Sequence, residues 1–206
     1  MAFQAMLQVV FGHFNNKMYR LCPDVSTGFF GLHYVRPHRT TMLPIVAVQE
    51  KYAASYRACL DVVAREKRYL AQIEALPLER IEGFVKDSVA ADAIQFFALN
   101  QEEVVGWADI FPSWAHAVAH CGSLGMGVHP NYRGQGLGSR LLSACIHKAW
   151  AKGLTRIVLQ ARADNLHAIA LYEKFGFKHE ALKSQAMRFD GEYFDAVQMR
   201  LLRDEA

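Results

Sequence analysis

Residues 125–138 have the sequence GMGVHPNYRGQGLG, and this stretch decides the predicted fold. A strand-like segment precedes it, and a segment with helical periodicity follows it. A glycine-rich loop that opens a helix is typical of a phosphate site, because the first N–H groups of a helix are unpaired and its dipole attracts anions. Gly134, Gly136 and Gly138 let the backbone approach a ligand, and Arg133 adds a cation.

Two common phosphate-binding patterns do not fit this stretch. The dinucleotide pattern G-x-G-x-x-G requires a third glycine, but Ser139 or Leu141 stands there, depending on where the count starts. The Walker pattern G-x-x-x-x-G-K-[ST] is also absent. A glycine-rich turn without a ligand is the alternative, but three alternating glycines cost backbone entropy without a structural need. The loop therefore indicates a phosphate ligand of another kind.

A second informative segment follows, NLHAIALYEKFGF at residues 165–177. Asn165 and Tyr172 are seven residues apart, about two helical turns, so both can lie on one helix face. Taken separately, an asparagine N-cap and a buried core tyrosine explain these residues equally well. Their position downstream of the glycine-rich loop favours a shared site.

The two segments together resemble the GCN5-related N-acetyltransferase (GNAT) superfamily. The resembling motifs are R-x-x-G-x-G at residues 133–138 and N-x-x-A-x-x-x-Y-x-x-x-G-F at residues 165–177, and the resemblance covers roughly residues 43–202. It implies an α/β acyl-CoA N-acyltransferase fold, with a mixed central sheet splayed at its middle strands and helices flanking it. It also implies acetyl-CoA as co-substrate and direct transfer of its acetyl group to a primary amine, without a metal.

The resemblance assigns roles to individual residues. Tyr172 would be the general acid that protonates the departing coenzyme A thiolate, and a backbone N–H near Met126 would polarise the thioester carbonyl. The pantetheine arm would lie along the splayed strands. The implied cofactor-binding residues are Leu124, Met126, Gly127, Val128, Arg133, Gly134, Gln135, Gly136, Leu137, Gly138, Ser139, Asn165 and Tyr172.

The general base is the uncertain part of the predicted site. Many relatives use a carboxylate in the strand before the loop, but residues 119–124 contain neither Asp nor Glu. His120 is the best local candidate, because an imidazole titrates near neutral pH. A buried structural histidine is the alternative reading of His120. Asp109 and Glu50 are the weaker candidates for the base.

The chain divides into an N-terminal extension, residues 1–41, which lacks sustained periodicity, and an N-acetyltransferase domain, residues 42–206. Within the domain, periodicity and turn residues predict strands and helices in mixed order. The predicted strands are 43–49, 94–99, 104–111, 118–128, 156–163 and two around a turn at residues 190–191. The predicted helices are 52–63, one after Pro77 with Leu78, Ile81, Val85 and Val89 on one face, 136–152 and 165–175.

Composition limits the other classes of function. The 206 residues are 52% hydrophobic and 21% charged, and the net charge of +3 is too small to argue for nucleic acid. No apolar run approaches a membrane span, and the start does not resemble a signal peptide. Four cysteines without C-x-x-C spacing favour free thiols in the cytoplasm. His116 and His120 are four apart but lack the H-E-x-x-H pattern of a zinc site.

The acceptor stays open at this stage. A small amine such as an amino acid or a polyamine is expected, but peptide N-termini or lysines are an alternative, as is an acyl-CoA sensor without catalysis. Trp107, Phe111 and Trp114 could form the wall of an acceptor pocket, although core packing also explains Trp107. A homodimer is a further expectation. Cys121 could carry an acyl group, but a small buried cysteine is the simpler explanation.

Overall fold

The computed structural model describes residues 42–205, so the predicted extension, residues 1–41, lies outside the described residues. The strands are β1 Ile45–Ala47, β2 Ile94–Asn100, β3 Glu103–Pro112, β4 Cys121–Val128, β5 Arg156–Arg162, β6 Lys178–Phe189 and β7 Glu192–Leu202. The helices are α1 Ala53–Ala64, α2 Leu78–Ala90, α3 Leu137–Ala151 and α4 Leu166–Lys174. No helix among these residues is long and apolar enough to cross a membrane.

The strands form a seven-stranded sheet in the order β1-β2-β3-β4-β5-β7-β6. Neighbours are antiparallel except β4 and β5, which run parallel. The parallel pair is joined through α3, which provides the long crossover connection that parallel strands require. The predicted mixed α/β sheet is therefore confirmed.

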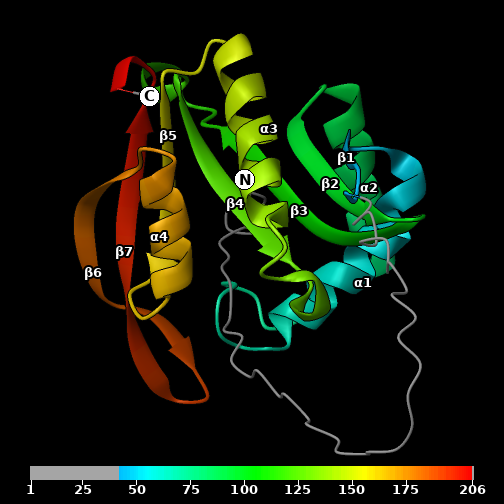
Figure 1. Cartoon of the computed structure of the whole chain (residues 1–206), viewed down its shortest axis with the longest axis horizontal. Coiled ribbons are helices and arrows are strands. Elements are labelled where there is room, and N and C mark those ends of the chain that lie inside the picture. The colour runs from blue at the N-terminus through cyan, green and yellow to red at the C-terminus, as the bar shows by residue number, and fades with distance from the viewer. Residues whose placement is uncertain (1–41, 206) are drawn as a thin grey trace, which may run out of the picture.

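The sheet splays between β4 and β5. Their pairing is limited to Cys121–Ser123 on β4 and Arg156–Val158 on β5. β4 continues to Val128, but beyond Ser123 it pairs only with β3 among the described residues. In Figure 1 the two strands start close together and separate toward the end where α3 begins. The predicted splay at the middle strands is confirmed, and it leaves one edge of β4 without a neighbouring strand.

Two hydrophobic cores cover the two faces of the sheet. Trp107 on β3 packs with residues of α1 and α2, whereas its neighbour Ala108 packs with residues of α3. This alternation follows from the two-residue period of a strand. β3 is therefore buried on both faces, which explains its nearly continuous apolar sequence. The face under α1 and α2 is called the α1/α2 face below.

Most predicted elements are found, with three corrections. The strand predicted from residue 118 begins at Cys121, because residues 116–118 form a 3₁₀ turn. The strand predicted over residues 43–49 is shorter, Ile45–Ala47. Val89 is 37% exposed, and the inner face of α2 is completed by Phe84 and Ser88 instead. The 3.6-residue repeat carries position 89 away from the sheet by the last turn of the helix.

Candidate functional site

The glycine-rich loop leads into α3 as the sequence predicts. Gly134 and Gly136 have φ of 72° and 77°, a region that glycine adopts without strain. Gly136 is the N-cap of α3, and no side chain caps the helix. The N–H groups of the first turn, those of Leu137, Gly138 and Ser139, therefore have no acceptor within the helix. A Cβ placed on Gly136 meets nothing within 4 Å, and residues 134–136 are exposed, so the loop before α3 is open to solvent.

Arg133 holds the loop to another part of the chain. Its Nε donates to the Val128 carbonyl at 2.9 Å, and its terminal nitrogens donate to Glu66 at 2.6 and 3.0 Å. The side chain is only 8% exposed. This mostly buried ion pair fixes the loop, and Glu66 largely balances the charge of Arg133. A phosphate at this loop would therefore rely mainly on the backbone N–H groups.

Hydrogen bonds at both ends of β4 show which backbone groups face β3. The Ser113 N–H donates to the Cys121 carbonyl, and the His129 N–H donates to the Val105 carbonyl. In an antiparallel pair, hydrogen-bonded positions recur every second residue. The odd-numbered residues of β4 therefore bond to β3, and the even-numbered ones face the opposite edge.

Leu124, Met126 and Val128 are thus the residues whose backbone points into the splay. Val128 already gives its carbonyl to Arg133, but no described strand pairs with Met126 on this side. An extended ligand can hydrogen-bond such an edge as an additional strand would. Of the positions expected to bind the pantetheine arm, Met126 is the one that no described strand pairs with on this side.

Asn165 and Tyr172 lie together on α4, both buried. Asn165 is the N-cap, and its Oδ1 accepts the Ala168 N–H at 3.3 Å, while its Nδ2 has no hydrogen-bond partner within the described residues. Tyr172 is 2% exposed and packs against Phe177, with ring centroids 5.7 Å apart. Burial raises the pKa of the Tyr172 phenol above its ordinary value. The phenol therefore keeps its proton across the neutral range.

The structure places His120 away from the open edge. It is exposed, in the turn before β4, and its carbonyl accepts N–H bonds from Thr155 and Arg156. This is the end where β4 and β5 are still paired. Met126 is six residues further along, a span of about 20 Å in an extended strand. Cys121, next to His120, is half-buried rather than buried as expected.

A buried polar pair on β2 and β3 is not indicated by any motif in the sequence. Gln95 and Asp109 are direct cross-strand partners, and both are 0% exposed. Neither the amide of Gln95 nor the carboxyl of Asp109 has a hydrogen-bond partner with normal geometry within residues 42–205. The predicted strands 94–99 and 104–111 contain the available signal, because a short connection between two strands favours a hairpin, and a hairpin brings these two positions together.

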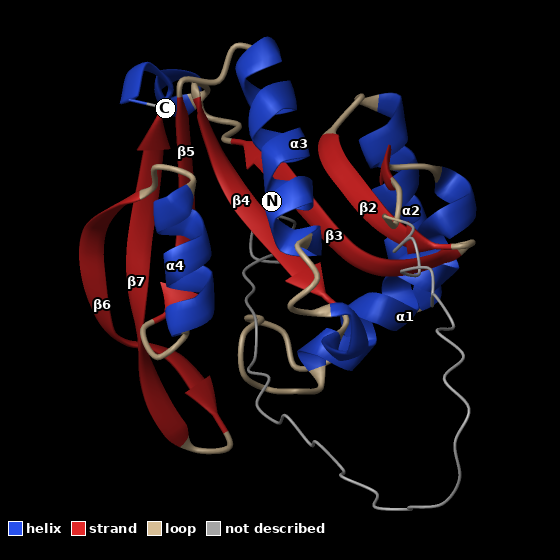
Figure 2. Cartoon of the chain, in the orientation of Figure 1, coloured by secondary structure: helices blue, strands red, loops and turns tan. Residues whose placement is uncertain are grey.

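Two ion pairs join segments at the end where the sheet splays. The connection between α1 and α2 carries Glu66, bound to Arg133, and Lys67, whose Nζ lies 2.7 Å from Asp190 Oδ1 in the β6–β7 turn. Figure 2 shows this connection, the β6–β7 turn and the loop before α3 at the same end of the sheet. Tyr69 of the connection is 4% exposed and packs into the α3 core. These segments flank the mouth of the gap between β4 and β5.

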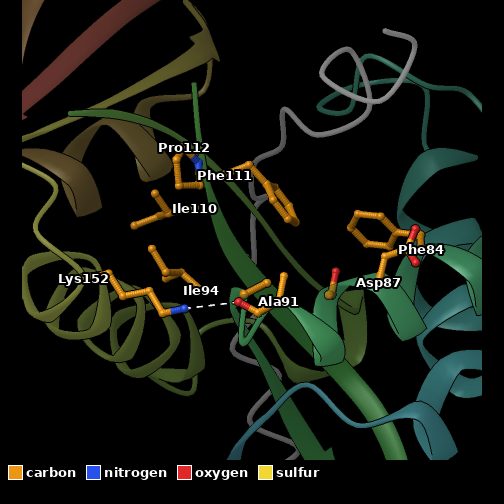
Figure 3. Close-up of a pocket in the computed structure, with 10 residues that line it drawn as sticks. Phe84, Asp87, Ala91, Ile94, Ile110, Phe111, Pro112 and Lys152 are labelled. Atoms are coloured by element: carbon orange, nitrogen blue, oxygen red, sulfur yellow. Dashed lines mark hydrogen bonds between the residues drawn. The ribbon is translucent and has the colours of Figure 1, made fainter. Parts of the chain in front are cut away.

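A cavity among the described residues lies elsewhere. It measures about 400 Å³ and is lined mainly by apolar side chains, including Phe84 from α2, Ile110 and Phe111 from β3, and Ile94 (Figure 3). The Lys152 Nζ at its rim donates to the Ala91 carbonyl. None of the predicted cofactor-binding residues lines it. Trp107 is fully buried in the core and Trp114 is 80% exposed, so neither forms a pocket wall here.

Comparison with known proteins establishes the family. The family model described as "Acetyltransferase (GNAT) family" matches residues 56–177, which include the loop, the splayed strands and α4. The chain belongs to the GNAT acetyltransferase family. A curated relative, acetyltransferase SG1711 of Sodalis glossinidius, is 42% identical over 53 residues. That match spans 26% of this chain and 37% of the relative's length.

Solved structures share the fold over most of the chain. A GNAT acetyltransferase from Streptococcus pneumoniae is 28% identical with a TM-score of 0.73, covering 78% of this chain and 99% of that one. The protein yncA from Salmonella typhimurium, solved with its cofactor acetyl-CoA, is 19% identical with a TM-score of 0.74, covering 80% and 96%. Ribosomal-protein-alanine N-acetyltransferase from Brucella melitensis is 22% identical with a TM-score of 0.73, covering 78% and 99%.

Proposed function

We propose that this GNAT-family chain transfers the acetyl group of acetyl-CoA to a primary amine. The observation that carries the proposal is that one chain combines two features. The edge of β4 is open at Met126, and the N-terminus of α3 at Gly136 has no side-chain cap. The first can hydrogen-bond a pantetheine arm, and the second can bind a pyrophosphate. Asn165 Nδ2, which lacks a partner within the described residues, is a further donor for the arm.

Tyr172 would supply the proton that the leaving sulfur needs. When the amine adds to the thioester and the C–S bond breaks, the electron pair leaves with sulfur. A buried phenol with a raised pKa is protonated at neutral pH, so it can donate a hydrogen bond and then a proton to the thiolate. This role favours an enzyme over the alternative of a non-catalytic acyl-CoA sensor.

A small amine is the acceptor that the surroundings of the gap favour. The ion pair between Lys67 and Asp190 joins the α1–α2 connection to the β6–β7 turn beside the gap between β4 and β5. An extended peptide would need room at this place. A protein acceptor is the second candidate, and a screen of amino acids, polyamines and peptides for thiol release from acetyl-CoA separates the two.

Free thiols at Cys59 and Cys145 support a reducing compartment such as the cytoplasm. We keep the homodimer as a proposal for light scattering to test.

Substitution of Gly136 tests the cofactor site. Gly136→Asp brings a negative charge against the pyrophosphate and should abolish the binding of acetyl-CoA in a calorimetric titration. Gly136→Asn is the matched control, because asparagine has a similar size and tolerates positive φ but carries no charge. Asn should bind more tightly than Asp by at least about tenfold. Equal, wild-type affinity in both folded variants would sink the proposed cofactor site.

A further inference from the structure

The amine must lose a proton before it attacks, and no carboxylate lies on β4 itself. The α1/α2 face of the sheet supplies one from the neighbouring strand. Asp109 lies between Trp107 and Phe111, which both pack toward α1 and α2, so its side chain shares that face. Its direct partner on β4 is Gly125, one residue from the open backbone of Met126.

Glycine residues on β4 leave space between Asp109 and the gap that separates β4 from β5. Hydrogen-bonded antiparallel partners have Cα atoms about 5.5 Å apart, so the carboxyl of Asp109 stands beside Gly125. Gly125 has no side chain to separate this carboxyl from the unpaired edge of β4. At the next position along the same face, the indole of Trp107 covers Gly127, with atoms 2.3–2.8 Å from where a Cβ would lie. The space left by the missing side chain of Gly125 is therefore bounded by Trp107 on one side.

The buried Gln95–Asp109 pair, which has no hydrogen-bond partner of normal geometry among the described residues, destabilises the fold. Burying a carboxyl and an amide without hydrogen bonds costs more than leaving them in water. The Gly125 N–H lies close enough to favour the ionised carboxyl, but burial outweighs it and raises the pKa of Asp109 well above its ordinary value. The groups that face Asp109 are Gln95 on β2, Tyr56 on α1 and, through the sheet, Cys145 on α3. None of these supplies a positive charge.

We infer that Asp109, with Gln95 as its cross-strand neighbour, accepts the proton of the acceptor ammonium. This rests on the proposed acetyl transfer and identifies the proton acceptor of that site. The carboxylate takes one proton from the ammonium, and the freed lone pair forms the C–N bond to the thioester carbonyl carbon. The C–S bond then breaks, and its electron pair leaves with sulfur, which takes the Tyr172 proton. The second proton lost by nitrogen restores Tyr172, and Asp109 releases its proton to solvent, so one proton is released overall.

The experiment compares an amine that needs deprotonation with one that does not. Ethylamine is an ammonium ion at neutral pH, whereas hydroxylamine is mostly neutral there. Thiol release from acetyl-CoA is measured with each amine for the wild type and Asp109→Asn, with Asp87→Asn on the surface of α2 as the control. Asp109→Asn should lose about 10²-fold or more in kcat/KM with ethylamine and less than about threefold with hydroxylamine. The Asp87 variant should match the wild type with both.

The pH dependence gives a second readout. The rise of kcat/KM with pH for ethylamine combines the ionisation of the amine, which is the same for both enzymes, with the ionisation of Asp109. The part due to Asp109 should be absent in Asp109→Asn, whereas hydroxylamine should give similar profiles with both enzymes. If that variant does not fold, Gln95→Met replaces it and should lower the ethylamine rate more than the hydroxylamine rate. A merely structural role predicts equal losses with both amines.

Several results would overturn the inference. They are no loss in Asp109→Asn, an equal loss with both amines, a wild type inactive with both, or an ethylamine-specific loss in His120→Gln instead. Calorimetry with acetyl-CoA separates failure of the proposed function from failure of this inference alone. A wild type that does not bind acetyl-CoA overturns the proposed function and this inference with it. A wild type that binds acetyl-CoA and an Asp109→Asn variant without the selective loss overturn this inference only.

Discussion

Tyr172 shows how burial shapes a single functional side chain. Its position among apolar residues of α4 and the sheet keeps the phenol protonated, and the same burial makes it a weaker acid than a tyrosine in water. A bound coenzyme A would bring sulfur to the phenol, so the proton needs to move only across one hydrogen bond. The residue therefore contributes a positioned proton rather than strong acidity.

Tyr172→Phe tests this role. The change keeps the ring and its packing on Phe177, so the variant should fold with little change in melting temperature. We expect kcat to fall by about 10²-fold, because the leaving thiolate loses its proton donor, with acetyl-CoA affinity nearly unchanged. Steady-state kinetics and calorimetry measure the two quantities. Tyr193→Phe on the surface is the control, and a Tyr172→Phe rate close to wild type would assign protonation to solvent.

Asp109 makes a second prediction at this scale, for stability. Its pKa is raised in the folded chain above the ordinary value of 3.8, so the folded state holds its proton to higher pH than the unfolded state does. The contribution of Asp109 to stability should therefore fall as pH rises above about 4, until the folded pKa is reached. Tyr56 and Cys145 nearby have raised pKa values and stay neutral over this range.

Asp109→Asn should remove the loss of stability that the ionisation of Asp109 causes as pH rises. The free energy of unfolding of the variant, minus that of the wild type, should increase between about pH 4 and about pH 7 in urea titrations. Asp87→Asn is exposed and should show no such trend. A difference that stays flat or decreases with pH would mean that the carboxyl is ionised and stabilised in the fold.

At the scale of the strands, glycine on β4 serves packing as well as ligand access. Gly127 accepts the indole of the fully buried Trp107, which also contacts the ring of Tyr56 with centroids 5.7 Å apart. The family resemblance implies that Gly127 contacts the cofactor. The structure adds a reason within the fold: α1 can pack on the sheet only if β4 leaves room for the indole.

Gly127→Ala should therefore be destabilising. The new Cβ would lie 2.3 Å from the Trp107 ring, and neither the ring nor the strand can move far within the core. Overpacking of this kind costs about 1–3 kcal/mol, which thermal or urea unfolding can measure. Gly83→Ala on α2 is a control, because a Cβ there meets nothing within 4 Å and alanine favours a helix. Equal stability of the two variants would contradict the packing role.

At the scale of the whole molecule, the described residues already form both cores. β1 is the edge strand of the sheet, and the Arg140 Nη1 donates to the Leu43 carbonyl, which anchors the chain just before β1. The hydrogen bonds and core contacts of residues 42–205 join these residues to one another around the sheet.

A chain that begins at Thr41 should therefore fold and bind acetyl-CoA within a factor of about two of the full chain. Circular dichroism and calorimetry check this. A chain that begins at Gln49 lacks β1 and exposes the edge of β2, so it should be less stable or aggregate. Loss of acetyl-CoA binding in the Thr41 chain would show that residues 1–40 contribute to the catalytic domain.

The sequence by itself determined the features that depend on local chemistry. Glycine spacing indicates the loop and its positive φ at Gly134 and Gly136, Asn165 marks the start of α4, and Asp190–Gly191 forms the β6–β7 turn with φ of 47° and 94°. Each of these is decided by residues a few positions apart, so periodicity and turn preferences suffice to predict them. The resemblance of two short motifs then supplied the family.

Only the tertiary structure decided which distant side chains meet. Arg133 was expected to face the phosphate, but Glu66, 67 residues away in sequence, binds its guanidinium. The strand before the loop contains no carboxylate, yet strand pairing places Asp109 beside Gly125 and Gln95 beside Asp109. His120, adjacent to that strand in sequence, is carried to its far end. Pairing register and the splay depend on the packing of whole strands and helices, and a pattern within one segment contains no information about either.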